Sequence, residues 1–168
     1  GDNLDTNAAI HLVTITNATL DNVDITGGAE QGINGNTVSA FQLLNSTVTN
    51  VGNAPDEDNI HFFNMSGTCA ITNTTLTHTS GGGDDNLNLQ TTAGTLNLTI
   101  SGGGATGVNG GVNQVGSGYL FGIRGTSNAT ITFNNAARTA TCRGGHVPEV
   151  DALPFAACPT PAATGATP

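Results

Sequence analysis

A seven-residue pattern recurs along the chain and limits its fold more than any other feature. In each copy an apolar residue precedes an Asn by two positions, and a second apolar residue followed by Thr comes three positions after the Asn. The clearest copies span residues 20–26, 43–49 and 71–77, so the Asn recurs after 23 and then 28 residues. Uneven spacing of this kind predicts a solenoid of strands with variable loops, because stacked helical repeats tolerate changes in length poorly.

Further apolar runs precede each Asn and alternate with period two. The order apolar, polar, apolar is found in residues 10–12, 60–62 and 87–89. In the second copy the corresponding run begins with residues 33–35. This period predicts strands with His11, His61 and Asn88 facing outward. The abundance of Thr, Asn and Gly favours strands over helices for the same segments.

The recurring Asn distinguishes among the all-β architectures that short strands can build. A sandwich gives no reason for one residue type to recur at one corner, whereas stacked coils do: Asn tolerates a left-handed corner, and its amide can hydrogen-bond to the next coil. We therefore predict an all-β, right-handed parallel β-helix of about five coils over residues 1–135. We expect its corner ladder to consist of Asn22, Asn45, Asn73, Gly102 and Asn135, although Asn97 and Asn128 fit a competing register for the last coils.

The pattern stops after Asn135, and residues 136–168 are predicted to form an irregular or disordered tail. Five of the six prolines, two of the three arginines and two of the three cysteines fall in this segment. Two interpretations remain open: a disordered tail or linker, or a boundary that truncates a longer β-helix. Cys142 and Cys158 could close a loop, whereas Cys69 is expected to be buried. The glycine-rich residues 102–118 are expected to form a protruding loop.

Charge excludes some classes of partner. The net charge is −9, with three arginines and no lysine. Such a surface cannot neutralise a row of phosphates, so nucleic acid is excluded and anionic membranes are disfavoured. No apolar stretch is long enough for membrane insertion. Divalent cations and neutral sugars remain compatible, and the absence of lysine favours an exported protein.

The aligned copies resemble the repeat region of secreted or surface-displayed bacterial β-helix proteins, of the pectin-lyase-like and autotransporter-passenger type. The resemblance is carried by residues 43–50, 69–77 and 94–101, and it covers roughly residues 8–135. It implies a fragment of a protein that is secreted or held at the bacterial cell surface. Because such folds include adhesins, lyases, glycosidases and inert stalks, the resemblance transfers no catalytic residues.

Acidic residues precede two of the predicted strands at matching places. Glu57 and Asp84 are equivalent in neighbouring coils, as are Asp58 and Asp85. Stacked carboxylates must bind a cation, take up a proton or face water. Three interpretations remain open: a calcium site with Asn59 and Asn86 nearby, solvated turn carboxylates, or a catalytic pair. Asp84 and Asp85 are the catalytic candidates, because glycosidases use paired carboxylates. The Gly-His-Gly and Arg-Ile-Lys elements of polygalacturonases are missing.

These observations favour a non-catalytic scaffold or adhesin-type segment, whose outer Asn and Thr side chains would bind glycans or partner proteins. The alternative is a fragment of a polysaccharide lyase or glycosidase that uses Asp84 and Asp85. Apart from calcium, no cofactor is expected. A threonine column of Thr26, Thr49 and Thr77 suggests ice binding less strongly, because Asp24, Asn50 and His78 interrupt the array on the outside of the coils. Uncovered coil ends would permit end-to-end self-association.

Overall fold

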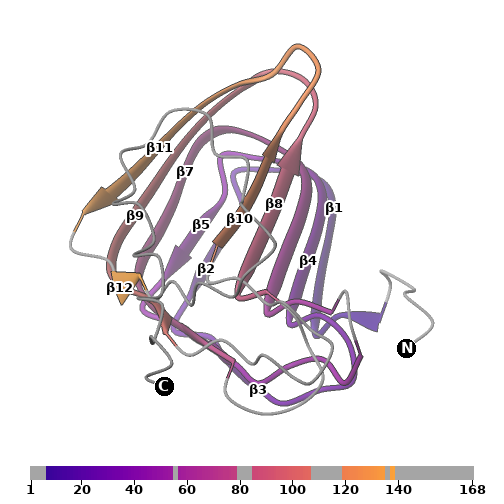
Figure 1. Cartoon of the computed structure of the whole chain (residues 1–168), viewed down its shortest axis with the longest axis vertical. Helices are drawn as coiled ribbons and strands as arrows, with labels where there is room; N and C mark the ends of the chain where they lie inside the picture. The colour runs from indigo at the N-terminus through magenta and orange to yellow at the C-terminus, as the bar shows by residue number, and fades with distance from the viewer. Residues whose placement is uncertain (1–6, 55–56, 79–84, 107–118, 135–136, 139–168) are drawn as a thin grey trace, which may run out of the picture.

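The structure is a computed structural model that describes residues 7–54, 57–78, 85–106, 119–134 and 137–138. The described residues form an all-β arrangement in which every strand pairing is parallel. Figure 1 shows the strands side by side in a curled, solenoid-like sheet. The twelve strands are β1 Ile10–Thr16, β2 Thr19–Asp21, β3 Asp24–Thr26, β4 Ile33–Ser39, β5 Gln42–Leu44, β6 Thr47–Thr49, β7 Ile60–Thr77, β8 Leu87–Thr91, β9 Thr95–Thr106, β10 Tyr119–Ile123, β11 Asn128–Asn134 and β12 Ala137–Arg138.

Three runs of stacked strands make up the sheet. The first run contains β1, β4, the start of β7, β8 and β10, and pairs Ile10 with Ile33, Ile33 with Ile60, and so on. The second run contains β2, β5, the middle of β7, β9 and β11, and the third contains β3, β6, the end of β7, the end of β9 and β12. The strands predicted from alternation therefore stack in the order in which they occur along the chain.

Left-handed backbone positions mark the bends between runs. The predicted corner residues Asn22, Asn45, Asn73 and Gly102 have φ of 56°, 48°, 49° and 61°. The fifth predicted corner, Asn135, lies outside the described residues. Three further rows of left-handed residues were not predicted, because they contain residue types that give no consistent signal. Asn17, Ala40 and Gly67 form one row and Gly27 and Asn50 another, while Thr14, Thr37 and Asn64 form a row inside β1, β4 and β7.

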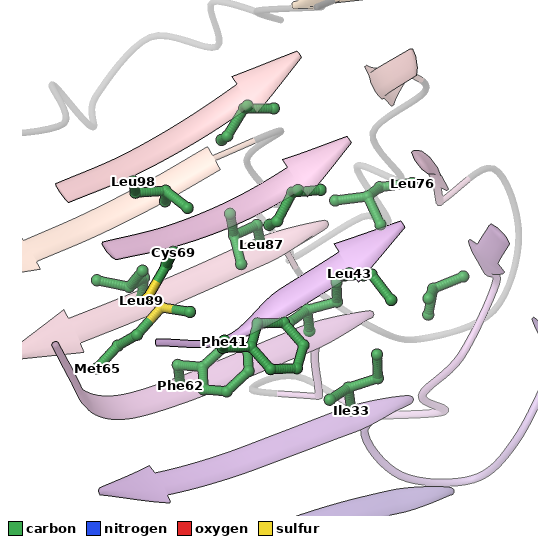
Figure 2. Packing of buried hydrophobic residues seen from close by; sticks show 14 of the residues in the cluster. Ile33, Phe41, Leu43, Phe62, Met65, Cys69, Leu76, Leu87, Leu89 and Leu98 are labelled. Carbon is green, nitrogen blue, oxygen red and sulfur yellow. The ribbon is translucent and has the colours of Figure 1, made fainter. Parts of the chain in front are cut away.

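The core lies inside the curl and consists of the inward residues of each alternating strand. Phe41 and Phe62 pack with ring centroids 4.9 Å apart, and Met65 and Cys69 lie beside them in Figure 2. Cys69 is a buried free thiol, as predicted, and burial raises the pKa of its side chain. Gly35 pairs with Phe62, and a Cβ at Gly35 would lie 2.2 Å from the ring, so only glycine leaves room for it.

The glycine-rich segment after residue 102 differs from its prediction. Strand β9 continues to Thr106 and pairs with the end of β7, so the expected protruding loop is wrong for residues 103–106. Glycine is required here for packing: a Cβ at Gly103 would lie 2.3 Å from the carbonyl oxygen of Thr74. Residues 107–118 lie outside the described residues.

The ladder also extends past residue 135. Ala137 and Arg138 pair with Gly104 and Ala105, in line with the third run of strands. The rest of the predicted tail, with Cys142 and Cys158, lies outside the described residues. Within the described ranges, no helix has the length and hydropathy of a membrane span.

Candidate functional site

The predicted acidic residues come together at the turns that lead into β7 and β8. The backbone N–H of Asp85 donates to Oδ1 of Asp58 at 3.0 Å, and the backbone N–H of Asn59 donates to the carbonyl of Asp85 at 2.9 Å. Asp58 and Asp85 therefore occupy adjacent stacked positions, the places at which the sequence aligned them. Asp84, which was aligned with Glu57, lies outside the described residues.

The three described carboxylates are buried, so the interpretation as solvated turn carboxylates is wrong for Glu57, Asp58 and Asp85. The exposed fractions of Glu57, Asp58 and Asp85 are 1%, 1% and 2%. Glu57 Oε2 accepts hydrogen bonds from the backbone N–H groups of Asn53 and Ala54 in the turn before it. Glu57 binds backbone donors of its own turn, and Asp58 binds one of the neighbouring coil, a use that the periodicity of the strands does not encode.

Asn59 and Asn86 hold the same turns together through their amides. Asn59 Nδ2 donates to Asn86 Oδ1 at 2.6 Å and to the carbonyl of Thr77 at 3.1 Å, while its Oδ1 accepts from the backbone N–H of Val51. Both Asn side chains are fully buried. A buried amide with all of these partners fixes the loop before β7 against the end of the same strand.

The turn does not assemble a metal centre from the residues that the structure describes. Among them, no group of three His, Cys, Asp or Glu side chains is placed to hold a metal ion. Oxygens of Glu57 and Asp58 accept backbone hydrogen bonds instead. The calcium set of Glu57, Asp58, Asp84 and Asp85 stays a prediction, since one of its members lies outside the described residues.

His78 lies near this turn and is buried, although the sequence placed it on the outside. Its exposed fraction is 0%, and neither ring nitrogen has a hydrogen-bond partner among the described residues. It follows Thr77, whose carbonyl binds Asn59. Burial lowers the pKa of His78, because the charged imidazolium loses its hydration.

A second polar region lies on the outer face of the first run of strands. Two columns of side chains run across β1, β4, β7 and β8: one contains His11, Asn34, His61 and Asn88, and the other contains Val13, Asn36, Phe63 and Gln90. Between them is a depression of about 340 Å³, lined by Asn34, Gly35, Asn36, His61, Phe63 and Gln90.

Phe63 is the most unusual member of this face. Its exposed fraction is 42%, whereas the preceding Phe62 is fully buried in the core. The sequence analysis did not single out Phe63, Asn36 or Gln90. The available signal was the Phe62-Phe63 pair, because two consecutive aromatic residues in a strand must point to opposite faces.

His61 connects the two regions. Its Nδ1 lies 3.7 Å from Oδ2 of Asp58, and its side chain is partly exposed in the depression. His11 and His61 are separated in their column by Asn34, as the sequence predicted. The buried carboxylate of Asp58 therefore lies directly behind the outer face.

The predicted corner ladder forms hydrogen bonds over part of its length. Asn73 Nδ2 donates to Asn45 Oδ1 at 3.3 Å, and Asn45 Nδ2 donates to Asp21 Oδ1 at 2.9 Å instead of reaching Asn22. At Gly102 a Cβ would lie 2.4 Å from Asn73 Oδ1, so the Asn73 amide lies where that Cβ would be.

Hydroxyl columns on the second and third runs also bridge neighbouring strands. Thr49 donates to Thr26 at 3.3 Å, in the column that the sequence predicted. Ser101 donates to Thr72 at 3.2 Å on the adjoining run.

No protein family, curated protein or solved structure matches this chain in comparison.

Proposed function

We propose that this chain is a segment of a right-handed parallel β-helix of about five coils, from a secreted or surface-displayed bacterial protein of the pectin-lyase-like or autotransporter-passenger type. The in-register stack of Ile10, Ile33, Ile60, Leu87 and Tyr119 supports five coils. Right-handedness follows from the near-universal hand of crossovers between parallel strands. The surface setting rests on the resemblance and on the lysine-free composition.

The function that the geometry supports best is a non-catalytic, adhesin-type scaffold that binds glycans or partner proteins on its outer faces. The carrying observation is the set of polar columns that repeat from strand to strand, such as Asn34, His61 and Asn88. Parallel strands repeat every ~4.8 Å, so each column offers regularly spaced polar groups on a rigid surface. Many weak polar contacts of this kind suit an extended ligand better than a small molecule.

The enzymatic alternative draws no specific support from the described residues. Asp85 is buried, and its backbone N–H binds Asp58. A glycosidase carboxylate must reach the scissile bond of its substrate, which a buried side chain does not. Asp84 lies outside the described residues, so the proposed pair rests on the sequence alone.

Two measurements on the full chain test this proposal. We expect retention of the protein on immobilised glycans or on a bacterial surface extract, and no release of reducing ends or unsaturated products from a polysaccharide panel. Turnover that is lost in the Asp84→Asn/Asp85→Asn variant would establish the enzyme and overturn the scaffold. Absence of binding to both glycans and surface proteins would also contradict the proposal.

A further inference from the structure

We propose that the depression around Phe63 binds a neutral, extended hexopyranose chain that lies along the stacking direction of the coils. This inference rests on the proposed function and makes it specific, since it names one face, one ligand class and one anchoring side chain. The stacking direction is that of the columns, across β4, β7 and β8.

The first argument is the chemistry of the column that contains Phe63. Its ring is 42% exposed, and its neighbours in the column are Asn36 on β4 and Gln90 on β8. An exposed aromatic ring offers an apolar surface to the C–H face of a pyranose, and amides on either side can donate to and accept from hydroxyl groups. This combination of one ring and flanking amides matches the alternating apolar and polar surfaces of a sugar.

The second argument is distance. Neighbouring strands lie ~4.8 Å apart, which is close to the length of one residue in an extended β-linked hexose chain. A chain that follows the column would therefore place successive sugars over Asn36, Phe63 and Gln90. Gly122 comes next in the column and has no side chain, and the Nε of Arg124 lies 3.9 Å from the position that its Cβ would take, so the Arg124 side chain lies beside the β10 end of this path.

The third argument is charge. The depression is lined by amides, glycine, Phe63 and one histidine, without Arg, Lys, Asp or Glu. His61 itself lies 3.7 Å from the Asp58 carboxylate, so any positive charge on its ring is offset from behind. In a chain of net charge −9, this lining offers no permanent cation to a uronate or sulfate, and Arg124 lies outside it, beside Gly122 at the β10 end of the column. The ligand class is therefore neutral.

The fourth argument is rigidity. The lining residues lie on paired strands, and Phe62, next to Phe63, is locked in the core against Phe41. Asn34 is buried in its column, which limits its rotamers. Side chains held by a packed sheet lose little entropy when a ligand binds.

Calorimetry on the full chain tests the proposal with two oligosaccharides of equal length, a neutral β-linked glucan hexamer and a hexamer of galacturonate. We expect binding of the neutral hexamer, with Phe63→Ala weakening it about tenfold or more and Phe63→Tyr retaining it, because tyrosine keeps the aromatic face. Ile123→Ala is the matched control, since Ile123 is an exposed apolar residue outside the column, and we expect it to bind like the parent chain. Circular dichroism checks the fold of each variant.

Three results would overturn the proposal: equal binding by Phe63→Ala and the parent, preference for the acidic hexamer, or no binding of either hexamer. If the chain is retained on other glycans or on surface proteins while the neutral hexamer fails to bind, only this inference is lost and the scaffold proposal stands. If it is retained on none of them, both are lost.

Discussion

Replacing Gly35 by alanine is expected to destabilise the fold, against the usual effect of this substitution. Where the backbone permits it, Gly→Ala stabilises by about 0.4–1 kcal/mol through the unfolded chain. Here the new Cβ would lie 2.2 Å from two ring carbons of Phe62. Phe62 is fully buried with its ring centroid 4.9 Å from that of Phe41, so it cannot swing away without displacing a second ring.

The magnitude follows from the cost of overpacking. Forcing an extra methyl into a filled core costs about 1–3 kcal/mol, so we expect the free energy of unfolding of Gly35→Ala to fall by roughly 2 kcal/mol. Urea denaturation followed by far-UV circular dichroism measures it. Gly122→Ala is the control: its Cβ would approach Gln90 Cγ at 3.3 Å, a flexible side chain that can yield.

A double-mutant cycle with Phe62→Leu isolates the proposed cause. Leucine has no ring carbons at the point of collision, so Gly35→Ala should cost about 1–2 kcal/mol less in the Phe62→Leu background. Equal costs in the two backgrounds, or stabilisation by Gly35→Ala in the parent chain, would refute the packing argument.

Two further predictions concern the corner and the buried histidine. Asn45→Ala should lower the free energy of unfolding by about 1–2 kcal/mol, because alanine resists the left-handed φ of 48°. Asn45→Gly should recover most of that loss. Equal losses for the two variants in urea denaturation would mean that the backbone conformation is not the reason for Asn at this position. Burial lowers the pKa of His78 in the folded state below its ordinary value of ~6.5. As the pH drops, His78 therefore takes up a proton in the unfolded chain before it does so in the folded chain. The free energy of unfolding should fall as the pH drops from ~6.5 towards the pKa of the folded state. Thermal denaturation across this range should therefore show a shallower decline in His78→Leu, and an unchanged slope would contradict the assignment.

The strands and one row of corners could be predicted from the sequence because their determinants are local. Alternation places Ile60 and Phe62 inward, and the left-handed requirement selects Asn at positions 22, 45 and 73. The rows through Thr14 and Ala40 could not be predicted, since no residue preference marks them. At Thr14, Thr37 and Ala40 the pairing of neighbouring strands imposes the backbone conformation, against the preference of these residues.

The candidate site was predicted less well, for a different physical reason. Sequence alignment placed Asp58 beside Asp85, and the structure brings them together. Their burial, and that of His78, depends on tertiary packing around the turn, which strand periodicity does not determine. Phe63 was missed because an outward residue contributes little to folding, so the alternation of apolar residues that identifies the core does not predict it.

The constant bend between the second and third runs of strands determines where the chain can change in length. Asp21 to Asp24, Leu44 to Thr47 and Thr72 to Thr75 each span three residues, whereas the return from Thr26 to Ile33 takes 7 residues and that from Thr49 to Ile60 takes 11. Lengthening a surface connection costs little, only about 0.6 kcal/mol for each doubling. The connection from the first run to the second also varies, from 6 residues between Asn36 and Gln42 to 9 between Gln90 and Thr99. Evolution or engineering can therefore insert new peptide at either of these connections, while the bend between the second and third runs keeps its spacing.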